Sequence, residues 1–202
     1  MARILRARTF GYQSNCYMIL TDRAVAVVDP SVPPEAFHFP DGAVPTHIFL
    51  THAHFDHILA LDEYVKRFSC SVYLSPLDAE LLDDPEKNAS AVFGLPPVRS
   101  TVKTLPVSDG DRIDLGEPLE VLRSPGHTAG SVCYRLGDTL FTGDTLFRGG
   151  FGRCDLYGGS EAVLRRTLAR LFSLPEDYRI LPGHGSETHL SDEKAHFFSA
   201  YD

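Results

Sequence analysis

Apolar residues in the first part of the chain gather into short runs that are separated by turn residues. Residues 4–10, 15–20 and 24–28 form three such runs, and the breaks between them fall at 11–14 and 21–23. Runs of this length between polar turn residues are typical of β-strands. The third run is continuously apolar, which predicts a strand that is covered on both faces.

The following residues mix strand and helix patterns. Residues 46–50 predict another buried strand, and 56–68 carry apolar side chains at helical spacing. A short strand is predicted at 71–74. A helix is predicted at 76–82, where proline occupies a tolerated position in the first turn. Prolines bracket residues 83–100, which we interpret as a linker between two halves of the chain.

The second half repeats the same kind of pattern. Further strands are predicted at 102–106, 112–115, 119–124, 131–136, 139–142 and 179–181. Ser160 is suited to cap a helix that carries leucines on one face, and 192–201 predict a final helix. Because each half combines strands with helices, the pattern predicts an α/β fold of two sheets with helices outside both.

Composition and charge exclude several classes of protein. The chain has 202 residues, of which 43% are hydrophobic and 23% charged, as in soluble globular proteins. Its formal charge of −8 does not indicate the basic surface that a nucleic-acid-binding protein needs. No segment approaches the roughly 18–20 apolar residues of a membrane span or resembles a signal peptide, so we expect a cytoplasmic protein. Its four cysteines form no CxxC pair, and we expect free thiols.

The densest chemistry lies directly after the strand predicted at 46–50. His52, His54, Asp56 and His57 place four potential metal ligands within six residues, at a strand-to-helix turn. Asp29, at the end of an earlier strand, is either a turn residue or a carboxylate that holds one of these ligands in place.

Three further candidate ligands follow predicted strands in the second half. His127, Asp144 and His184 each come directly after a glycine that ends an apolar run. Glycine permits the sharp turn that places the next side chain at the edge of a sheet. Single histidines in loops are usually surface residues, but seven ligand-type residues that all lie at strand ends predict a metal centre.

Seven ligands are too many for one tetrahedral ion, and they suit two ions that share a carboxylate. His52 and His54 point to one side of an extended segment, whereas Asp56 and His57 lie where the backbone turns. We therefore predict one ion on His52, His54 and His127, and a second on Asp56, His57 and His184, with Asp144 on both. Imidazole and carboxylate ligands suit zinc foremost, and also iron or manganese.

These residues resemble the metallo-β-lactamase superfamily. The motif is His52-Ala53-His54-Phe55-Asp56-His57, and the sequences around His127, Asp144 and His184 are similar to its glyoxalase II-like branch, the short YcbL-type hydrolases. The resemblance covers nearly the whole chain. It implies a single domain over 1–202 with an αβ/βα sandwich of two mixed β-sheets, and a binuclear metal site at the sheet edge.

The resemblance also implies an activity, the hydrolysis of a small-molecule thioester such as S-lactoylglutathione. Residues 149–155 match a loop that borders the pocket in such enzymes, so Arg153 and Phe151 become candidate substrate-binding residues. Arg153 could hold a substrate carboxylate or could pair with Asp155 instead. The chain departs from its relatives at Leu59-Ala60, where two glycines are common, and it ends before the helical region that grips glutathione in longer enzymes.

The predicted mechanism uses a metal-bridged hydroxide that attacks the thioester carbonyl. Asp56 and Asp144 are the candidate catalytic residues, because both hold the ions and Asp56 could orient the hydroxide. Cys154 is interpreted as a thiol of the pocket wall. The sequence does not decide the oligomeric state.

Three alternatives remain open from the sequence. The first is a mononuclear iron persulfide dioxygenase of the same superfamily. The second is another superfamily hydrolase, namely a lactonase, a β-lactamase or an RNA-processing nuclease. The third is a non-catalytic metal-binding module.

Overall fold

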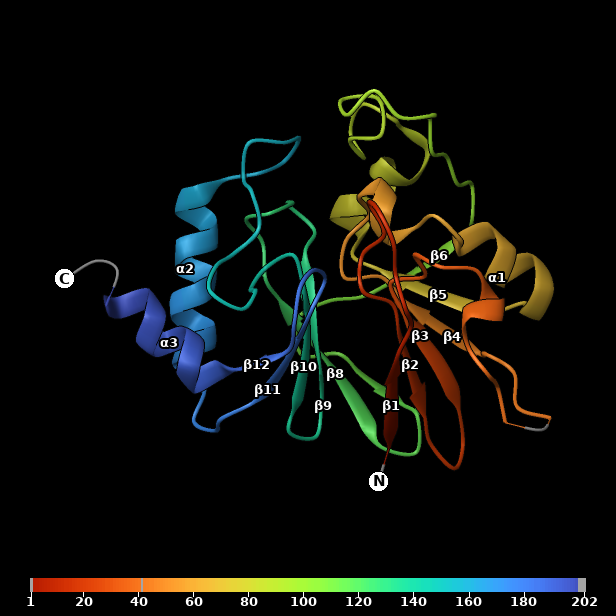
Figure 1. The fold of residues 1–202 in the computed structure, drawn as a ribbon, viewed down its shortest axis with the longest axis horizontal. Helices are drawn as coiled ribbons and strands as arrows, with labels where there is room; N and C mark the ends of the chain where they lie inside the picture. Colours follow the sequence, from red (N-terminus) through yellow and green to blue (C-terminus); the bar gives the residue numbers. More distant parts are fainter. Residues whose placement is uncertain (1, 41, 200–202) are drawn as a thin grey trace.

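The strands of the computed structural model form two six-stranded sheets that face each other, and the model describes residues 2–40 and 42–199 (Figure 1). In spatial order the first sheet consists of β1 (Arg3–Arg6), β2 (Tyr17–Leu20), β3 (Val25–Val28), β4 (His47–Phe49), β5 (Ser71–Leu74) and β6 (Thr104–Pro106). Strands β1 to β3 pair antiparallel, and β3 to β6 pair parallel. The first sheet is therefore mixed.

The second sheet is also mixed. In spatial order it consists of β12 (Thr188–His189), β11 (Arg179–Pro182), β10 (Thr139–Gly143), β9 (Val132–Leu136), β8 (Pro118–Arg123) and β7 (Arg112–Asp114). Strands β10 and β11 pair parallel, and the other neighbours pair antiparallel. Strands β8, β10 and β11 consequently run in one direction and end at the same edge.

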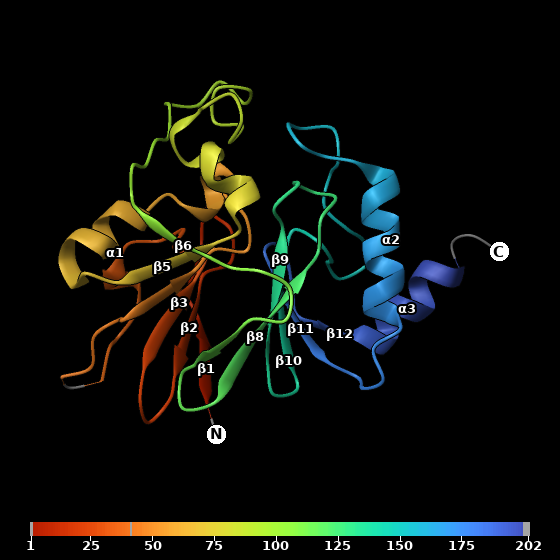
Figure 2. The same cartoon turned by 180° about the vertical axis from the view of Figure 1, so that it is seen from behind.

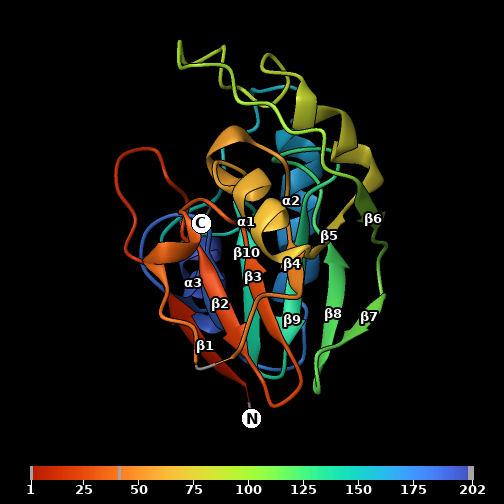
Figure 3. The ribbon, with the colours of Figure 1, turned by 90° about the vertical axis from the view of Figure 1, so that its right-hand side faces the viewer.

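Helices cover the outer faces of both sheets. Helix α1 (Leu61–Phe68) lies against the first sheet, whereas α2 (Glu161–Phe172) and α3 (Leu190–Ser199) lie beside the second (Figures 2 and 3). Three 3-10 helices complete the secondary structure: η1 (Pro34–Ala36), η2 (Phe55–His57) and η3 (Pro76–Asp83). The predicted αβ/βα sandwich is confirmed. No helix in the described part of the chain has the length and apolar character to cross a membrane.

The continuous apolar run of β3 is explained by its place between two apolar layers. Val25 and Val27 belong to the layer between the first sheet and α1, and Ala26 and Val28 belong to the layer between the two sheets. A third layer packs the second sheet against α2. All four side chains of β3 are buried, as the sequence predicts for a strand covered on both faces.

Several predicted elements differ from those observed. The strand predicted at 4–10 ends at Arg6, and the helix predicted at 56–68 begins as η2 before α1 starts at Leu61. The helix predicted at 76–82 has the tighter 3-10 form, and the two-residue strand β12 was not predicted. Of the helix predicted at 192–201, residues 200 and 201 lie outside the described residues.

The segment 83–100 does not join the two halves. It lies between β5 and β6, both of which belong to the first sheet, and it rises above that sheet as the yellow-green loops of Figure 1. Buried Asn88 fixes it by donating from Nδ2 to the carbonyls of Leu81 and Val98, at 3.0 and 2.9 Å. The segment is therefore an ordered cover beside the strand ends and not a free linker, because the hydrogen bonds of Asn88 hold its backbone in place.

Candidate metal centre

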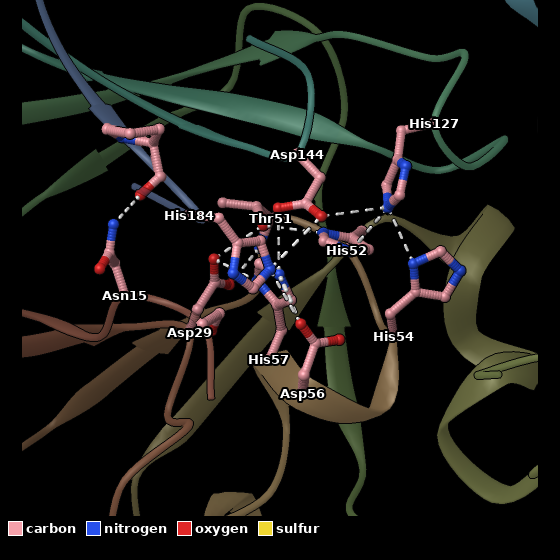
Figure 4. A network of polar contacts seen from close by, with 12 residues as sticks. Asn15, Asp29, Thr51, His52, His54, Asp56, His57, His127, Asp144 and His184 are labelled. Atoms are coloured by element: carbon pink, nitrogen blue, oxygen red, sulfur yellow. Dashed lines mark hydrogen bonds and ion pairs between the residues drawn. The ribbon is translucent and has the colours of Figure 1, made fainter. Parts of the chain in front are cut away.

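The strand ends of both sheets bring all seven candidate ligands together (Figure 4). His52 and His54 follow β4, and η2 carries Asp56 and His57. The ligands of the second sheet are His127 after β8, Asp144 after β10 and His184 after β11. Since these strands end at one edge, residues far apart in the sequence meet in one cluster, which we call the metal-ligand cluster.

Three histidines of the cluster point their ring nitrogens at one place. Nε2 of His127 lies 2.8 Å from Nδ1 of His54 and 3.2 Å from Nε2 of His52. All three side chains are buried. Their ligand atoms lie within 4.8 Å of one another, which is the geometry of three ligands around one ion.

A second group forms beside the first. Nε2 of His184 lies 3.0 Å from Oδ2 of Asp56, and Nε2 of His57 lies 3.7 Å from the same oxygen. Asp144 lies between the two groups. Its Oδ1 is 3.2 Å from His57 Nε2, and its Oδ2 is 3.6 Å from both His127 Nε2 and His184 Nε2.

Hydrogen bonds behind the cluster fix which ring nitrogen of His57 and of His127 faces the cluster. Asp29 is buried and accepts from His57 Nδ1 at 2.9 Å, while it also binds the backbone N–H of Thr51 at 2.8 Å. His127 donates from Nδ1 to the carbonyl of Arg153 at 2.7 Å. The Nε2 atoms of His57 and His127 are thereby left as ligands, the usual arrangement of metal-binding histidines.

Of the two roles that the sequence left open for Asp29, the structure shows the carboxylate that holds a candidate ligand, because both of its oxygens bond to Thr51 or His57. Its backbone adopts φ +50°, a left-handed conformation that aspartate tolerates in turns, and its carboxylate orients His57.

The chemistry of the cluster fits bound metal. Nε2 of His57 and Oδ1 of Asp144 are buried and face each other at 3.2 Å outside hydrogen-bond geometry, a costly arrangement unless a bound ion compensates it. A metal ion satisfies such inward-facing atoms, and imidazole with carboxylate is a donor set for zinc or iron. The cluster of histidine and aspartate side chains therefore fits a binuclear site.

Burial and charge divide the histidines into two kinds. Burial and the neighbouring imidazoles lower the pKa of His52 well below its ordinary value, and burial lowers the pKa of His54 to about 3. Burial acts in the same sense on His57, but Asp29 and the other nearby carboxylates outweigh it and raise its pKa well above the ordinary value. Burial also lowers the pKa of His184, but the hydrogen bond to Asp56 and the charges of Asp144 and Asp56 together outweigh it and raise the pKa.

Asp78 ties the two ligand-bearing loops together and was not found from the sequence. It is fully buried on η3, where Oδ1 accepts from the N–H of Gly130 at 2.8 Å. Its Oδ2 accepts from Thr128 Oγ1 at 2.7 Å and from the N–H of Ala53 at 3.3 Å. Ala53 stands between His52 and His54, so Asp78 joins their loop to the loop that follows His127.

Asn15 supports the last ligand loop in a similar way. Its Nδ2 donates to the carbonyls of Pro182 and Gly185 at 2.9 and 3.0 Å, and its own N–H donates to the Gly183 carbonyl at 2.6 Å. Glycine is needed at 183, because a Cβ there would lie 2.2 Å from Oδ1 of Asp144. The glycine before His184 thus allows the backbone to approach the shared carboxylate.

A cavity of about 290 Å³ opens over the cluster and is lined by Asp56, Asp144 and Arg153 among others. Arg153 forms a two-pronged ion pair with Asp155, with both N–O distances 2.7 Å. Phe151 does not line this cavity. It lies against a separate hollow of about 150 Å³ beside Phe172, contrary to the expectation that both residues border the metal pocket.

The four cysteines are free thiols, as predicted. Cys154 is partly buried and packs against the layer between the second sheet and α2, and burial raises its pKa. A protonated thiol is a poor nucleophile, but Cys154 is not among the residues that line the cavity over the cluster, contrary to its interpretation as a thiol of the pocket wall.

Comparison with known proteins supports this geometry. Residues 9–184 match the family model of the metallo-beta-lactamase superfamily. The chain is 36% identical to the probable metallo-hydrolase YqgX of Bacillus subtilis, over 90% of this chain and 90% of that protein. It is 37% identical to a hydroxyacylglutathione hydrolase of Rhizobium meliloti, over 69% of this chain but 48% of that protein.

Solved structures give the same result. The crystal structure of TTHA1623 in a di-iron-bound form has a TM-score of 0.83 and 38% identity, covering 93% of this chain and 96% of that chain. The structure of BLEG-1 B3 metallo-beta-lactamase has a TM-score of 0.87 and 31% identity, covering 96% of this chain and 97% of that one.

Proposed function

The chain belongs to the metallo-β-lactamase superfamily of metal-dependent hydrolases, and on this basis we propose that it is a binuclear thioester hydrolase. The proposed ligands of one ion are His52, His54 and His127, those of the other are Asp56, His57 and His184, and Asp144 reaches both. The position of Asp144 carries this proposal. One carboxylate turns one oxygen to His57 and the other to His127 and His184.

The chemistry that such a pair of ions supplies is hydroxide at neutral pH and polarisation of a carbonyl oxygen. Asp56 lines the cavity, so its carboxylate can accept a hydrogen bond from the attacking water. Asp29 keeps His57 oriented through Nδ1. Phe55 and Phe93 supply apolar walls that restrict water around the reacting carbonyl.

The choice of a thioester rests on the relatives. The Rhizobium meliloti protein is named a hydroxyacylglutathione hydrolase, and this chain matches 48% of its length. We propose zinc or iron as the metal, because imidazole and carboxylate ligands suit both. The similar structure of TTHA1623 is a di-iron-bound form, which supports iron as well as zinc. We also propose that the chain acts on a small molecule and needs neither nucleic acid nor membrane.

The test is an assay of simple thioesters with the metal-loaded protein, together with the Asp144→Ala variant. We expect hydrolysis by the wild type and a loss of about 100-fold or more in kcat/KM for the variant, with less bound metal. Asp138→Ala, which removes an exposed aspartate in the turn before β10, is the matched control and should keep full activity. Undiminished activity of Asp144→Ala would refute the shared carboxylate.

A second candidate is hydrolysis of a β-lactam, which the 31% identity to BLEG-1 favours. A chromogenic β-lactam assayed beside the thioesters separates the two reactions. Oxygen uptake with glutathione persulfide by a protein that holds one iron would instead support the dioxygenase alternative.

A further inference from the structure

A second hollow adjoins the cavity over the metal-ligand cluster. It has a volume of about 500 Å³ and shares Gly11, Tyr12 and Phe55 with that cavity. Its other lining residues are Phe10, Gln13, Leu59, Leu95, Pro96 and Val98. We call this hollow the apolar groove.

The apolar groove begins beside the candidate metal ligands. Phe55, which stands between the candidate ligands His54 and Asp56, forms part of the wall of both hollows. Its ring contacts Tyr12 edge-on at a centroid distance of 6.4 Å and Phe93 at 5.9 Å. A molecule whose reacting group lies over the cluster can therefore extend past Tyr12 into the groove.

The groove exposes large apolar side chains that a folded protein would otherwise bury. Phe10 is 64% exposed, Tyr12 63% and Leu59 43%. Figure 3 shows the loop after β1 and the 84–103 segment at the edge where the strands of the first sheet end. A contiguous exposed apolar surface is a mark of interaction sites, ligand-binding grooves among them.

Charge distinguishes the groove from a site for glutathione. Among the residues that the structure describes, none that lines the groove is charged. Apart from the candidate ligands, the cavity contributes Arg153, which is held by Asp155 and covered by the Phe93 ring at 5.3 Å. Arg8 lies outside the groove with its guanidinium on the Phe10 ring at 4.9 Å.

A glutathione arm carries two carboxylates and one ammonium group, which would meet apolar surface with no free partner in this groove. Placing an unpaired charge against such a surface is costly, whereas an alkyl or aryl chain gains free energy there.

We propose that the apolar groove binds an uncharged apolar arm of the substrate, so that the physiological substrate is a thioester with an aliphatic or aromatic chain. This inference rests on the proposed thioesterase function. The apolar arm is part of either the acyl group or the thiol of the thioester. In both cases the arm lies in the apolar groove.

Two substrate series separate these sources. In one, the acyl chain of S-acyl-N-acetylcysteamine grows from two to eight carbons; in the other, the thiol chain of S-alkyl thioacetates grows while the acyl group stays constant. We expect kcat/KM to rise about fourfold for each CH2 that the groove buries, in one of the two series. S-Lactoylglutathione should be a poorer substrate than the best member of that series.

Variants of the groove locate the effect. Phe10→Ser and Leu59→Asn should each lower the rise in kcat/KM per CH2 to about twofold, because each replaces an apolar side chain of the groove wall by a polar one. Leu105→Asn is the matched control, since Leu105 on β6 is 47% exposed and lies outside the groove, and it should leave the gain unchanged. If kcat/KM rose by the same factor per CH2 in Leu59→Asn and Phe10→Ser as in the wild type, the proposal would be overturned.

The proposal and the thioesterase function fail in different ways. Hydrolysis of thioesters without any dependence on chain length, or with preference for S-lactoylglutathione, would overturn the groove assignment and leave the function intact. If no thioester is hydrolysed, calorimetry with the unreactive S-octyl and S-ethyl thioethers of N-acetylcysteamine still tests the groove. Tighter binding of the octyl compound, weakened in Leu59→Asn, supports it, and equal affinities overturn it.

Discussion

The pKa values of His57 and His54 shift in opposite directions although the two residues stand three positions apart in one motif. Asp29 and the neighbouring carboxylates raise the pKa of His57, whereas burial lowers that of His54 to about 3. The sequence predicts both as ligands but does not reveal this difference, because Asp29 reaches His57 only through the parallel pairing of β3 with β4. The two ion positions should therefore respond differently to acid.

The ion held by Asp56, His57 and His184 is expected to leave first as the pH falls. A histidine must be neutral to bind metal, so a raised pKa means that a proton competes with the ion at a higher pH than at an ordinary histidine. His54 is neutral there and releases no proton. The affinity of the second position should fall about tenfold per pH unit for each proton, and more steeply than that of the first.

Metal analysis after dialysis between pH 8 and pH 5 checks this expectation. A step from two ions per chain to one, with His57→Ala holding one ion throughout, agrees with the assignment. Simultaneous loss of both ions would contradict the assignment, and so would earlier loss of the ion at His52, His54 and His127.

At the scale of elements, η3 holds together loops that lie far apart in the sequence. Asp78 accepts hydrogen bonds from Ala53, Thr128 and Gly130. The glycine before His127 makes the ligand predictable from a local pattern, but Asp78 carries no such pattern. Its partners are brought to it only by the packing of the two sheets, so the sequence could not reveal its role.

Asp78→Ala should lower the free energy of unfolding of the metal-free protein by about 2–3 kcal/mol, because buried donors lose their acceptor. Urea unfolding followed by circular dichroism measures this change. Asp83→Ala, an exposed position at the end of the same 3-10 helix, serves as the control and should change stability little. A loss for Asp78→Ala no larger than that of the control would show that the loops are held by other contacts.

At the scale of the whole molecule, apolar periodicity predicted two sheets with helices outside both, and the family resemblance implied the sandwich; the ligand-type residues at strand ends predicted the cluster. The continuous run of β3 needed apolar layers on both faces, and the structure supplies them. The cover at 83–100 could not be predicted, because its order depends on the buried hydrogen bonds of Asn88. The placement of Phe151 away from the metal pocket likewise depends on packing beside Phe172.

We propose that both sheets contribute ligands to one two-ion hydrolytic centre. Titration of the metal-free protein with zinc or iron(II), with thioester hydrolysis measured at each addition, tests it most directly. We predict that activity rises mainly with the second equivalent and reaches its plateau at two ions per chain. A plateau at one ion per chain, or full activity in the metal-free protein, would contradict the claim.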